Sequence, residues 1–270
     1  MIYERIKLGD FEEATLTPFC LEPCIKSPAP CRAIIVCPGG GYVNLSPRES
    51  EVVAVQYVAA GFATFVLSYG VKENAANYRP LKQVALAIRH VRENAAKYNV
   101  DPNYVFTCGF SAGGHLAASA GVLWNSPVLD KIAEGAPRDI VRPTAMILSY
   151  PVISAGEWGH KGSFKRLTGE DEPTDAQKHP FSLELHVDGT TPPAFIWHTF
   201  ADKGVLVQNS LLFAEAMTAA GVPFELHVFP EGPHGLSLAN EMTANNEGGI
   251  RPNVAKWLEL SIRWAKDLQV

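Results

Sequence analysis

The sequence predicts an α/β fold, in which a mostly parallel β-sheet is covered by helices on both faces. From residue 33 onward, short apolar runs alternate with segments whose apolar residues recur at three- and four-residue steps. The 270 residues are 47% hydrophobic and 19% charged, which is typical of a globular protein with a buried core. No linker separates two self-contained patterns, so residues 1–270 are expected to form a single domain.

The N-terminal residues differ from the rest of the chain. Segments 2–8 and 14–18 suggest an antiparallel hairpin at one edge of the sheet. The strands expected after this hairpin are short apolar runs bounded by turn residues. They lie at 33–37, 63–68, 105–109, 145–150, 194–198 and 225–229.

Helices are expected between these strands. Ser46-Pro47-Arg48-Glu49 has the spacing of a capping box with proline at the first helical position, and it predicts a helix that runs to Ala60 and stops at Gly61. Another helix is expected to begin at Ser111. The remaining helices are expected in three places: one with an apolar face of Leu81, Val84, Ala85, Ile88, Val91 and Ala95 that ends before Asp101-Pro102, one at 211–220, closed by Gly221, and one at 254–268.

Two stretches, 125–143 and 153–193, have irregular sequence that is rich in turn residues. The second is long for a connection within a compact domain. Connections of this length are usually lids or binding loops, so we expect one of these roles for 153–193.

Charge and hydropathy narrow the range of partners. The 23 Lys and Arg against 28 Asp and Glu give a net charge of −5, and no basic stripe is present that could neutralise phosphates, which argues against nucleic acid. No apolar run approaches the ~18 residues that a membrane span needs, so no membrane partner is expected. The N-terminal segment 1–7 lacks the pattern of a secretory signal, and a cytoplasmic protein is expected.

Five cysteines are present, and four of them crowd near one end of the chain. The spacing of Cys20, Cys24, Cys31 and Cys37 matches no zinc pattern. We interpret them as small buried apolar side chains in a reducing cytosol, with a metal site or a disulfide pair as the alternative.

The segment Gly109-Phe110-Ser111-Ala112-Gly113 carries the strongest chemical signal. It follows a predicted strand and opens an alanine-rich helix, which is the context of a nucleophile elbow. The turn at such a serine is tight enough that its neighbours must be small. We therefore predict Ser111 as a nucleophile, and the Ala112 N–H, in the first turn of the helix, as a donor to an oxyanion.

A second donor is expected from the glycine run Pro38-Gly39-Gly40-Gly41-Tyr42, which directly follows the strand at 33–37. Lipases and esterases carry an HGGG-type loop at this place. A phosphate-binding loop is the alternative, but neither the G-x-G-x-x-G pattern nor the Walker pattern is present. An oxyanion loop is the interpretation we favour.

A serine nucleophile needs a histidine base and an acid that fixes the tautomer of this histidine. Among the eight histidines, His234 lies just after the last strand, within Pro230–Gly235. Other histidines fit less well: His227 alternates within a strand, His115 lies one helical turn beyond Ser111, and His160, His179 and His186 belong to the irregular segment.

The acid is expected at Asp202, which follows the strand at 194–198. One helix and one strand separate it from His234, so both residues should lie on loops at the carboxyl ends of neighbouring strands. Asp171, Asp175 and Asp188 precede that strand and are interpreted as solvated loop residues.

Taken together, these segments resemble the α/β-hydrolase fold, and more narrowly the bacterial carboxylesterases of the acetylxylan and feruloyl esterase-like type. The resemblance extends from about Ala33 to the last helix. It implies Ser111 as nucleophile, His234 as base and Asp202 as orienting acid, with Gly40, Gly41 and Ala112 as oxyanion donors. Pro38 departs from the pattern, because a histidine often precedes the glycine run. Dienelactone hydrolases are a poorer match, because they use cysteine where this chain has Ser111.

The function expected from these residues is two-step acyl transfer without a metal or cofactor. The resemblance implies acetyl esters of sugars or xylo-oligosaccharides, whereas the residues alone imply an ester or amide. Large rings and a histidine near the site are expected to contact the substrate, and they are Tyr42, Phe110, Trp158 and His160. A peptidase or amidase and a non-catalytic binding module remain alternatives, and a homo-oligomer is compatible with the sequence.

Overall fold

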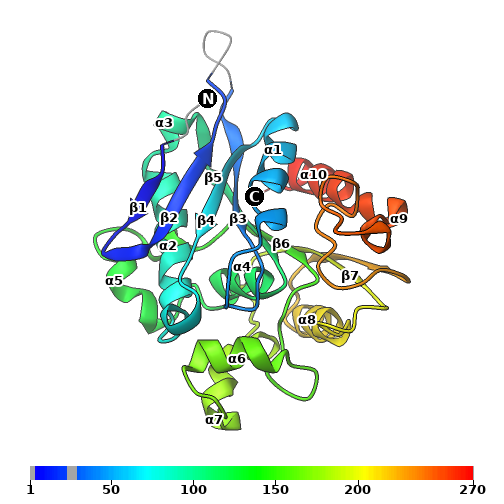
Figure 1. The fold of residues 1–270 in the computed structure, drawn as a ribbon. Coiled ribbons are helices and arrows are strands. Elements are labelled where there is room, and N and C mark those ends of the chain that lie inside the picture. Colours follow the sequence, from blue (N-terminus) through cyan, green and yellow to red (C-terminus); the bar gives the residue numbers. More distant parts are fainter. Residues whose placement is uncertain (1–3, 23–28, 270) are drawn as a thin grey trace.

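The computed structural model describes residues 4–22 and 29–269, and in this part of the chain eight strands form one sheet (Figure 1). The strands are β1 (Ile6–Leu8), β2 (Phe11–Phe19), β3 (Cys31–Cys37), β4 (Ala63–Ser68), β5 (Val100–Phe110), β6 (Ala145–Ser149), β7 (Ala194–Thr199) and β8 (Phe224–Phe229). Their order is β1-β2-β4-β3-β5-β6-β7-β8; neighbours from β4 to β8 run parallel, and β2 pairs antiparallel with both β1 and β4. The predicted fold class and its antiparallel N-terminal edge are confirmed, although Ile2 and Tyr3 lie outside the described residues.

Helices cover both faces of this sheet (Figure 1). The helices are α1 (Glu51–Ala59), α2 (Arg79–Glu93), α3 (Ala95–Tyr98), α4 (Ala112–Val122), α5 (Asp130–Ala133), α6 (Lys161–Thr168), α7 (Asp175–Lys178), α8 (Gln208–Ala219), α9 (Pro252–Ala255) and α10 (Trp257–Asp267). Side chains of α1 and α10 are buried against one face, and side chains of α2, α4 and α8 against the other.

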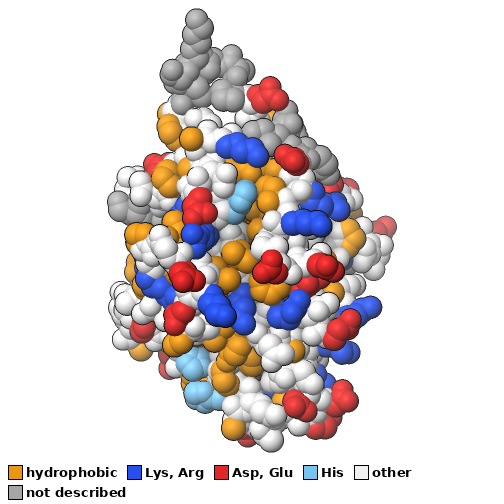
Figure 2. All heavy atoms as spheres, turned by 90° about the vertical axis from the view of Figure 1, so that its left-hand side faces the viewer, with side chains coloured by type: hydrophobic (Ala, Val, Ile, Leu, Met, Phe, Trp, Pro, Cys, Tyr) orange, Lys and Arg blue, Asp and Glu red, His pale blue; other side chains and the backbone are white. Residues whose placement is uncertain are grey.

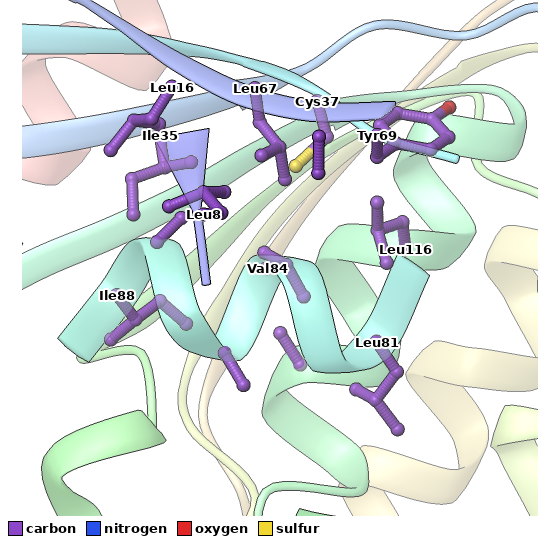
Figure 3. Packing of buried hydrophobic residues seen from close by; sticks show 14 of the residues in the cluster. Leu8, Leu16, Ile35, Cys37, Leu67, Tyr69, Leu81, Val84, Ile88 and Leu116 are labelled. Atoms are coloured by element: carbon purple, nitrogen blue, oxygen red, sulfur yellow. The ribbon is translucent and has the colours of Figure 1, made fainter. Parts of the chain in front are cut away.

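The central strand β3 shows why the strands read as continuous apolar runs. Ile35 and Cys37 belong to the hydrophobic cluster beneath α2, whereas Ile34 and Val36 belong to the cluster beneath α1 and α10. Because both faces are buried, apolar residues are required at every position. Figure 3 shows the first of these clusters, in which Leu81, Val84 and Ile88 of α2 are buried together with strand residues such as Leu16, Ile35 and Leu67.

The predicted capping box at the start of the first helix is wrong. A turn of 3₁₀ helix at Pro47–Glu49 precedes α1, and the Ser46 side chain makes no capping hydrogen bond. The Glu49 carboxylate is buried and accepts hydrogen bonds from the Gly39 N–H and from the Tyr150 hydroxyl. These partners are distant in sequence, so local spacing could not reveal them. The helix ends where it was predicted, with Gly61 at a φ of +94°.

The cysteines are unpaired wherever the structure describes them. Cys20, Cys37 and Cys108 are buried, as the sequence predicts, and Cys31 is half-buried. Cys24 lies outside the described residues. Over residues 4–22 and 29–269, no cluster of three or more metal-ligating side chains is found, and no helix has the length and apolar character of a membrane span.

The irregular segment 153–193 is folded rather than structureless. It contains α6, α7 and further 3₁₀ turns, and it buries Phe164, Leu167, Phe181 and Leu183. The segment is also fastened to α4, because His115 lies within hydrogen-bond distance of the Phe181 carbonyl.

His115 is fully buried. Its Nε2 atom lies 2.9 Å from the Phe181 carbonyl oxygen and its Nδ1 atom lies 2.9 Å from the Tyr42 hydroxyl. A carbonyl accepts only, so Nε2 carries the hydrogen and Nδ1 accepts from Tyr42. Burial lowers the pKa of this imidazole from its usual value of 6.5 to about 4.

This pKa predicts a loss of stability in mild acid. Unfolded His115 takes up a proton near pH 6.5 whereas the folded residue stays neutral to about pH 4. The stabilisation is therefore complete above pH 6.5 and is lost as the pH falls to 4, by about 3 kcal/mol in total. Urea unfolding between pH 4 and 7.5 should show this slope, and His115→Gln should flatten it. Equal slopes for both proteins would show that His115 titrates normally.

The surface around α2 and α5 carries both signs of charge. Figure 2 shows acidic and basic side chains interspersed on this face. Some of them form pairs, among them Arg79 with Glu13 and Arg138 with Asp130. This face therefore presents no stripe of one sign.

Candidate active site

Ser111 lies at a tight turn between β5 and α4. Its φ of +53° and ψ of −117° are rare for a residue with a side chain, and such strain is concentrated at functional sites. The turn leaves no room for larger neighbours: a Cβ on Gly109 would lie 2.1 Å from the Gly113 carbonyl oxygen, and one on Gly113 would lie 2.1 Å from that of Cys37. The strand, turn and helix expected around this serine are present.

The three predicted residues of the triad meet at the carboxyl ends of β5, β7 and β8. The Ser111 Oγ lies 2.8 Å from His234 Nε2, and His234 Nδ1 lies 2.7 Å from Asp202 Oδ2. Because a carboxylate only accepts, Nδ1 carries the hydrogen, and Nε2 is left to accept the serine proton. This arrangement can activate the hydroxyl for nucleophilic attack.

The Asp202 carboxylate is buried and fully engaged. Its Oδ1 accepts from the backbone N–H groups of Gly204 at 2.8 Å and Val205 at 3.0 Å. Burial alone would raise the pKa of this carboxyl, but hydrogen bonds from His198 and His234 and the charge of His234 hold it well below its usual range. Asp202 therefore stays ionised and orients His234.

His198 is a further residue of the site, and it was not predicted from the sequence. Its Nε2 lies 2.9 Å from the Val205 carbonyl oxygen and 3.4 Å from Asp202 Oδ2, while its Nδ1 lies 2.8 Å from the Ser210 hydroxyl. The Val205 carbonyl only accepts, so Nε2 carries a hydrogen, and this N–H also lies close to the Asp202 carboxylate. One feature of the sequence could have indicated this role: His198 lies in a predicted strand, four residues before the predicted acid Asp202.

The glycine loop, residues 38–42, contains backbone N–H groups that are free to bind an oxyanion. The Gly39 N–H is occupied, since it donates to Glu49 Oε2 at 2.9 Å. The N–H groups of Gly40, Gly41 and Ala112 donate to no atom of the described part of the chain. Gly40 must be a glycine, because its φ is +127° and a Cβ would lie 2.1 Å from the Asn44 carbonyl oxygen. The loop can therefore offer Gly40 and Gly41 to an oxyanion.

The expected contacts of Tyr42 and Phe110 with substrate are contradicted by the structure. The Tyr42 side chain is buried, with its hydroxyl on His115, and Phe110 is buried against Tyr150 and Trp257 on the α10 side of the sheet. Both residues flank the site in sequence, but their side chains point into the core.

The other two expected contacts differ from each other. His160 is half-buried, and its Cε1 lies 3.7 Å from the Cβ position of Gly41, so it borders the glycine loop. Burial lowers the pKa of His160, and nearby His234 lowers it further. Trp158 is half-buried, and its carbonyl accepts from Asn209. The structure thus places His160 beside the site and ties Trp158 to the start of α8.

Cavity size does not identify the site. A cavity of about 950 Å³ lies at the amino-terminal ends of β5, β6 and β7, the opposite edge of the sheet from Ser111. A cavity of about 460 Å³ lies beside His234 and is lined by Lys203, Glu231 and Arg251 among others. We locate the site by the hydrogen-bonded residues at the carboxyl ends of the strands, which is where open α/β sheets bind ligands.

Curated relatives of this chain include proteins that act on xylan. It is 42% identical over 212 residues to an endo-1,4-β-xylanase B of Butyrivibrio fibrisolvens, covering 77% of this chain and 33% of that protein. It is 32% identical over 233 residues to an acetylxylan esterase of Xylanibacter ruminicola, covering 84% of this chain and 45% of that protein. The chain thus spans less than half the length of either relative.

Solved structures match over nearly the full length. An acetyl ester-xyloside bifunctional hydrolase of Caldicellulosiruptor lactoaceticus superposes with a TM-score of 0.83 at 37% identity, covering 97% of this chain and 95% of that one. A carboxylesterase of Lactobacillus plantarum superposes with a TM-score of 0.84 at 27% identity, covering 99% and 98%. The model of the BD-FAE family matches residues 24–217, which is more than half of the chain. The chain therefore belongs to the BD-FAE family and has the α/β-hydrolase fold of carboxylesterases.

Proposed function

We propose that this protein is a serine carboxylesterase that hydrolyses acetyl esters of sugars or xylo-oligosaccharides. The observation that carries the proposal is the hydrogen-bonded series Ser111, His234 and Asp202 at a strained turn beside unoccupied backbone donors. Its relatives include carboxylic ester hydrolases, which supports ester hydrolysis as the reaction. The acetylated sugar is the finer part of the proposal, and two xylan-related relatives support it.

The proposed mechanism assigns each of these residues a step. His234 removes the Ser111 proton as Oγ attacks the ester carbonyl, and Asp202 stabilises the imidazolium that forms. The carbonyl oxygen becomes an oxyanion, which the N–H groups of Ala112 and the glycine loop bind. The alcohol leaves with a proton from His234, and water then hydrolyses the acyl-enzyme by the same steps.

A direct test compares p-nitrophenyl acetate with acetylated xylo-oligosaccharides and with peptide p-nitroanilides. Turnover of both ester classes and none of the anilides supports the proposal. Preference for anilides would indicate a peptidase or amidase instead, and binding without turnover would indicate a non-catalytic module.

Acyl length gives a sharper prediction. His160 borders Gly41, so it is placed to restrict the acyl group where the glycine loop meets the segment 153–193. Activity on p-nitrophenyl esters should fall steeply from acetate to butyrate and be negligible for octanoate, by more than the ~1 to 3 kcal/mol that one methylene usually contributes. His160→Ala should move the preference toward butyrate, whereas Lys161→Ala, at the exposed neighbour, should not. A flat or rising profile in the wild type would contradict the acetyl-ester proposal.

A further inference from the structure

A second buried acid lies beside Ser111, and the triad does not use it. Glu49 is only 4% exposed, and none of the ion pairs in the described part of the chain includes it. Its Oε2 accepts from the Gly39 N–H at 2.9 Å, and its Oε1 accepts from the Tyr150 hydroxyl at 2.7 Å. The Cβ position of Gly39 lies 2.6 Å from Glu49 Oε2 and 3.1 Å from Ser111 Cβ, so the carboxylate and the serine share a neighbour.

Tyr150 connects Glu49 with residues 230–246, the loop that carries His234, which we call the histidine loop. Its hydroxyl, which donates to Glu49, also accepts from the Ser237 N–H at 2.8 Å. Its ring stands edge-on to the His234 imidazole, with centroids 5.2 Å apart. One buried carboxylate and one phenol thus connect the glycine loop with the loop that carries the candidate base.

The residue before Glu49 attaches the 3₁₀ turn to the histidine loop by hydrogen bonds that do not involve the carboxylate. Arg48 donates to the carbonyl oxygens of Gly235 and Thr243, and its own carbonyl accepts from the Ser237 hydroxyl. The 3₁₀ turn at Pro47–Glu49 therefore stays attached to the histidine loop when only the Glu49 charge is removed. This allows the effect of the carboxylate on geometry to be separated from the folding of the loop.

We propose that Glu49 is a positioning residue for the esterase reaction, which makes the inference dependent on the proposed function. A carboxylate is the strongest acceptor available to a backbone N–H, so it fixes Gly39 and with it the orientation of Gly40 and Gly41. Through Tyr150 it also restrains His234. The hydrogen bonds of the Glu49 side chain go to Gly39 and Tyr150 rather than to the serine hydroxyl, so it acts by setting the donors at the place where the oxyanion develops.

The test is Glu49→Gln. Glutamine has the same size, but it cannot accept from both partners with its two terminal atoms, because one of them is an NH₂ group. Either the Gly39 N–H or the Tyr150 hydroxyl then loses its acceptor. We expect kcat per titrated active site to fall ~10- to 100-fold with little change in KM, because the contact matters most in the transition state. The Ki of a trifluoromethyl ketone that forms a tetrahedral adduct with the serine should rise by the same factor.

A merely structural role predicts a different result, namely a lower Tm with kcat per titrated serine and Ki unchanged. That result would overturn the inference. Tyr150→Phe tests the same connection with a smaller change, and it decides the matter if Glu49→Gln does not fold. Its kcat should fall by a similar factor, and the double variant should lose no more than the worse single variant.

Two controls separate this inference from the proposed function. Glu215→Gln changes an exposed acid on α8 and should leave kcat and Ki unchanged. If the wild type shows no ester hydrolysis that depends on Ser111, the proposed function fails and the inference fails with it. If the wild type is active and both Glu49→Gln and Tyr150→Phe keep its kcat and Ki, the inference alone fails.

Discussion

Replacing Ser111 by alanine should reduce ester hydrolysis by about 10⁴-fold or more. The variant keeps the hydrogen bond between His234 and Asp202 and the free N–H groups of the glycine loop, but it has no atom to form the acyl-enzyme. Folding should be unaffected, because the change removes one hydroxyl, whose hydrogen bond within the described part of the chain is to His234.

The measurement is turnover of p-nitrophenyl acetate together with thermal unfolding. A matched control is Ser119→Ala on the same helix, whose hydroxyl donates to the His115 carbonyl in the core. This variant should lose roughly 1 kcal/mol of stability and keep its activity. If Ser111→Ala retains even a tenth of the wild-type turnover, the nucleophile has been assigned to the wrong residue.

The fold could be predicted because strands of a parallel sheet that is buried on both faces are continuous apolar runs in the sequence. Each predicted strand overlaps an observed one. The largest error is at β5, which begins at Val100 rather than 105 because Val100 pairs with Cys31. Pro102 and Asn103 are typical turn residues, yet they are extended there, since these two positions are exposed and need no apolar side chains.

The backbone positions of the candidate site residues could be predicted, because they depend on which residues follow the strands along the chain. Ser111, Asp202 and His234 each follow a strand, and the carboxyl ends of parallel strands meet at one edge. Side-chain direction could not be predicted in this way, so Tyr42 and Phe110 were wrongly expected at the surface of the site. The bonds of Glu49 to Gly39 and Tyr150 also escaped prediction, because they join residues that are ten and a hundred and one positions apart.

The role of Asp202 can be tested by a change that alters its hydrogen bonding without altering its size. In Asp202→Asn the neighbouring groups allow only one orientation of the side-chain amide. The Oδ1 position accepts from Gly204 and Val205, so the amide oxygen must take that place. The NH₂ group then occupies the Oδ2 position, 2.7 Å from His234 Nδ1, and forces this nitrogen to accept.

His234 would then carry its hydrogen on Nε2, facing Ser111, and could not take the serine proton. We expect kcat to fall by about 10³- to 10⁴-fold, while the protein stays folded and binds substrate with nearly the same KM. Asp188→Asn is the matched control, since Asp188 is exposed and its carboxylate accepts from Thr190, and it should change turnover little. The opposite result would be a large loss of kcat in Asp188→Asn with little loss in Asp202→Asn. Because only a carboxylate that orients His234 can produce a defect of this size, that result would assign the acid to the segment 153–193.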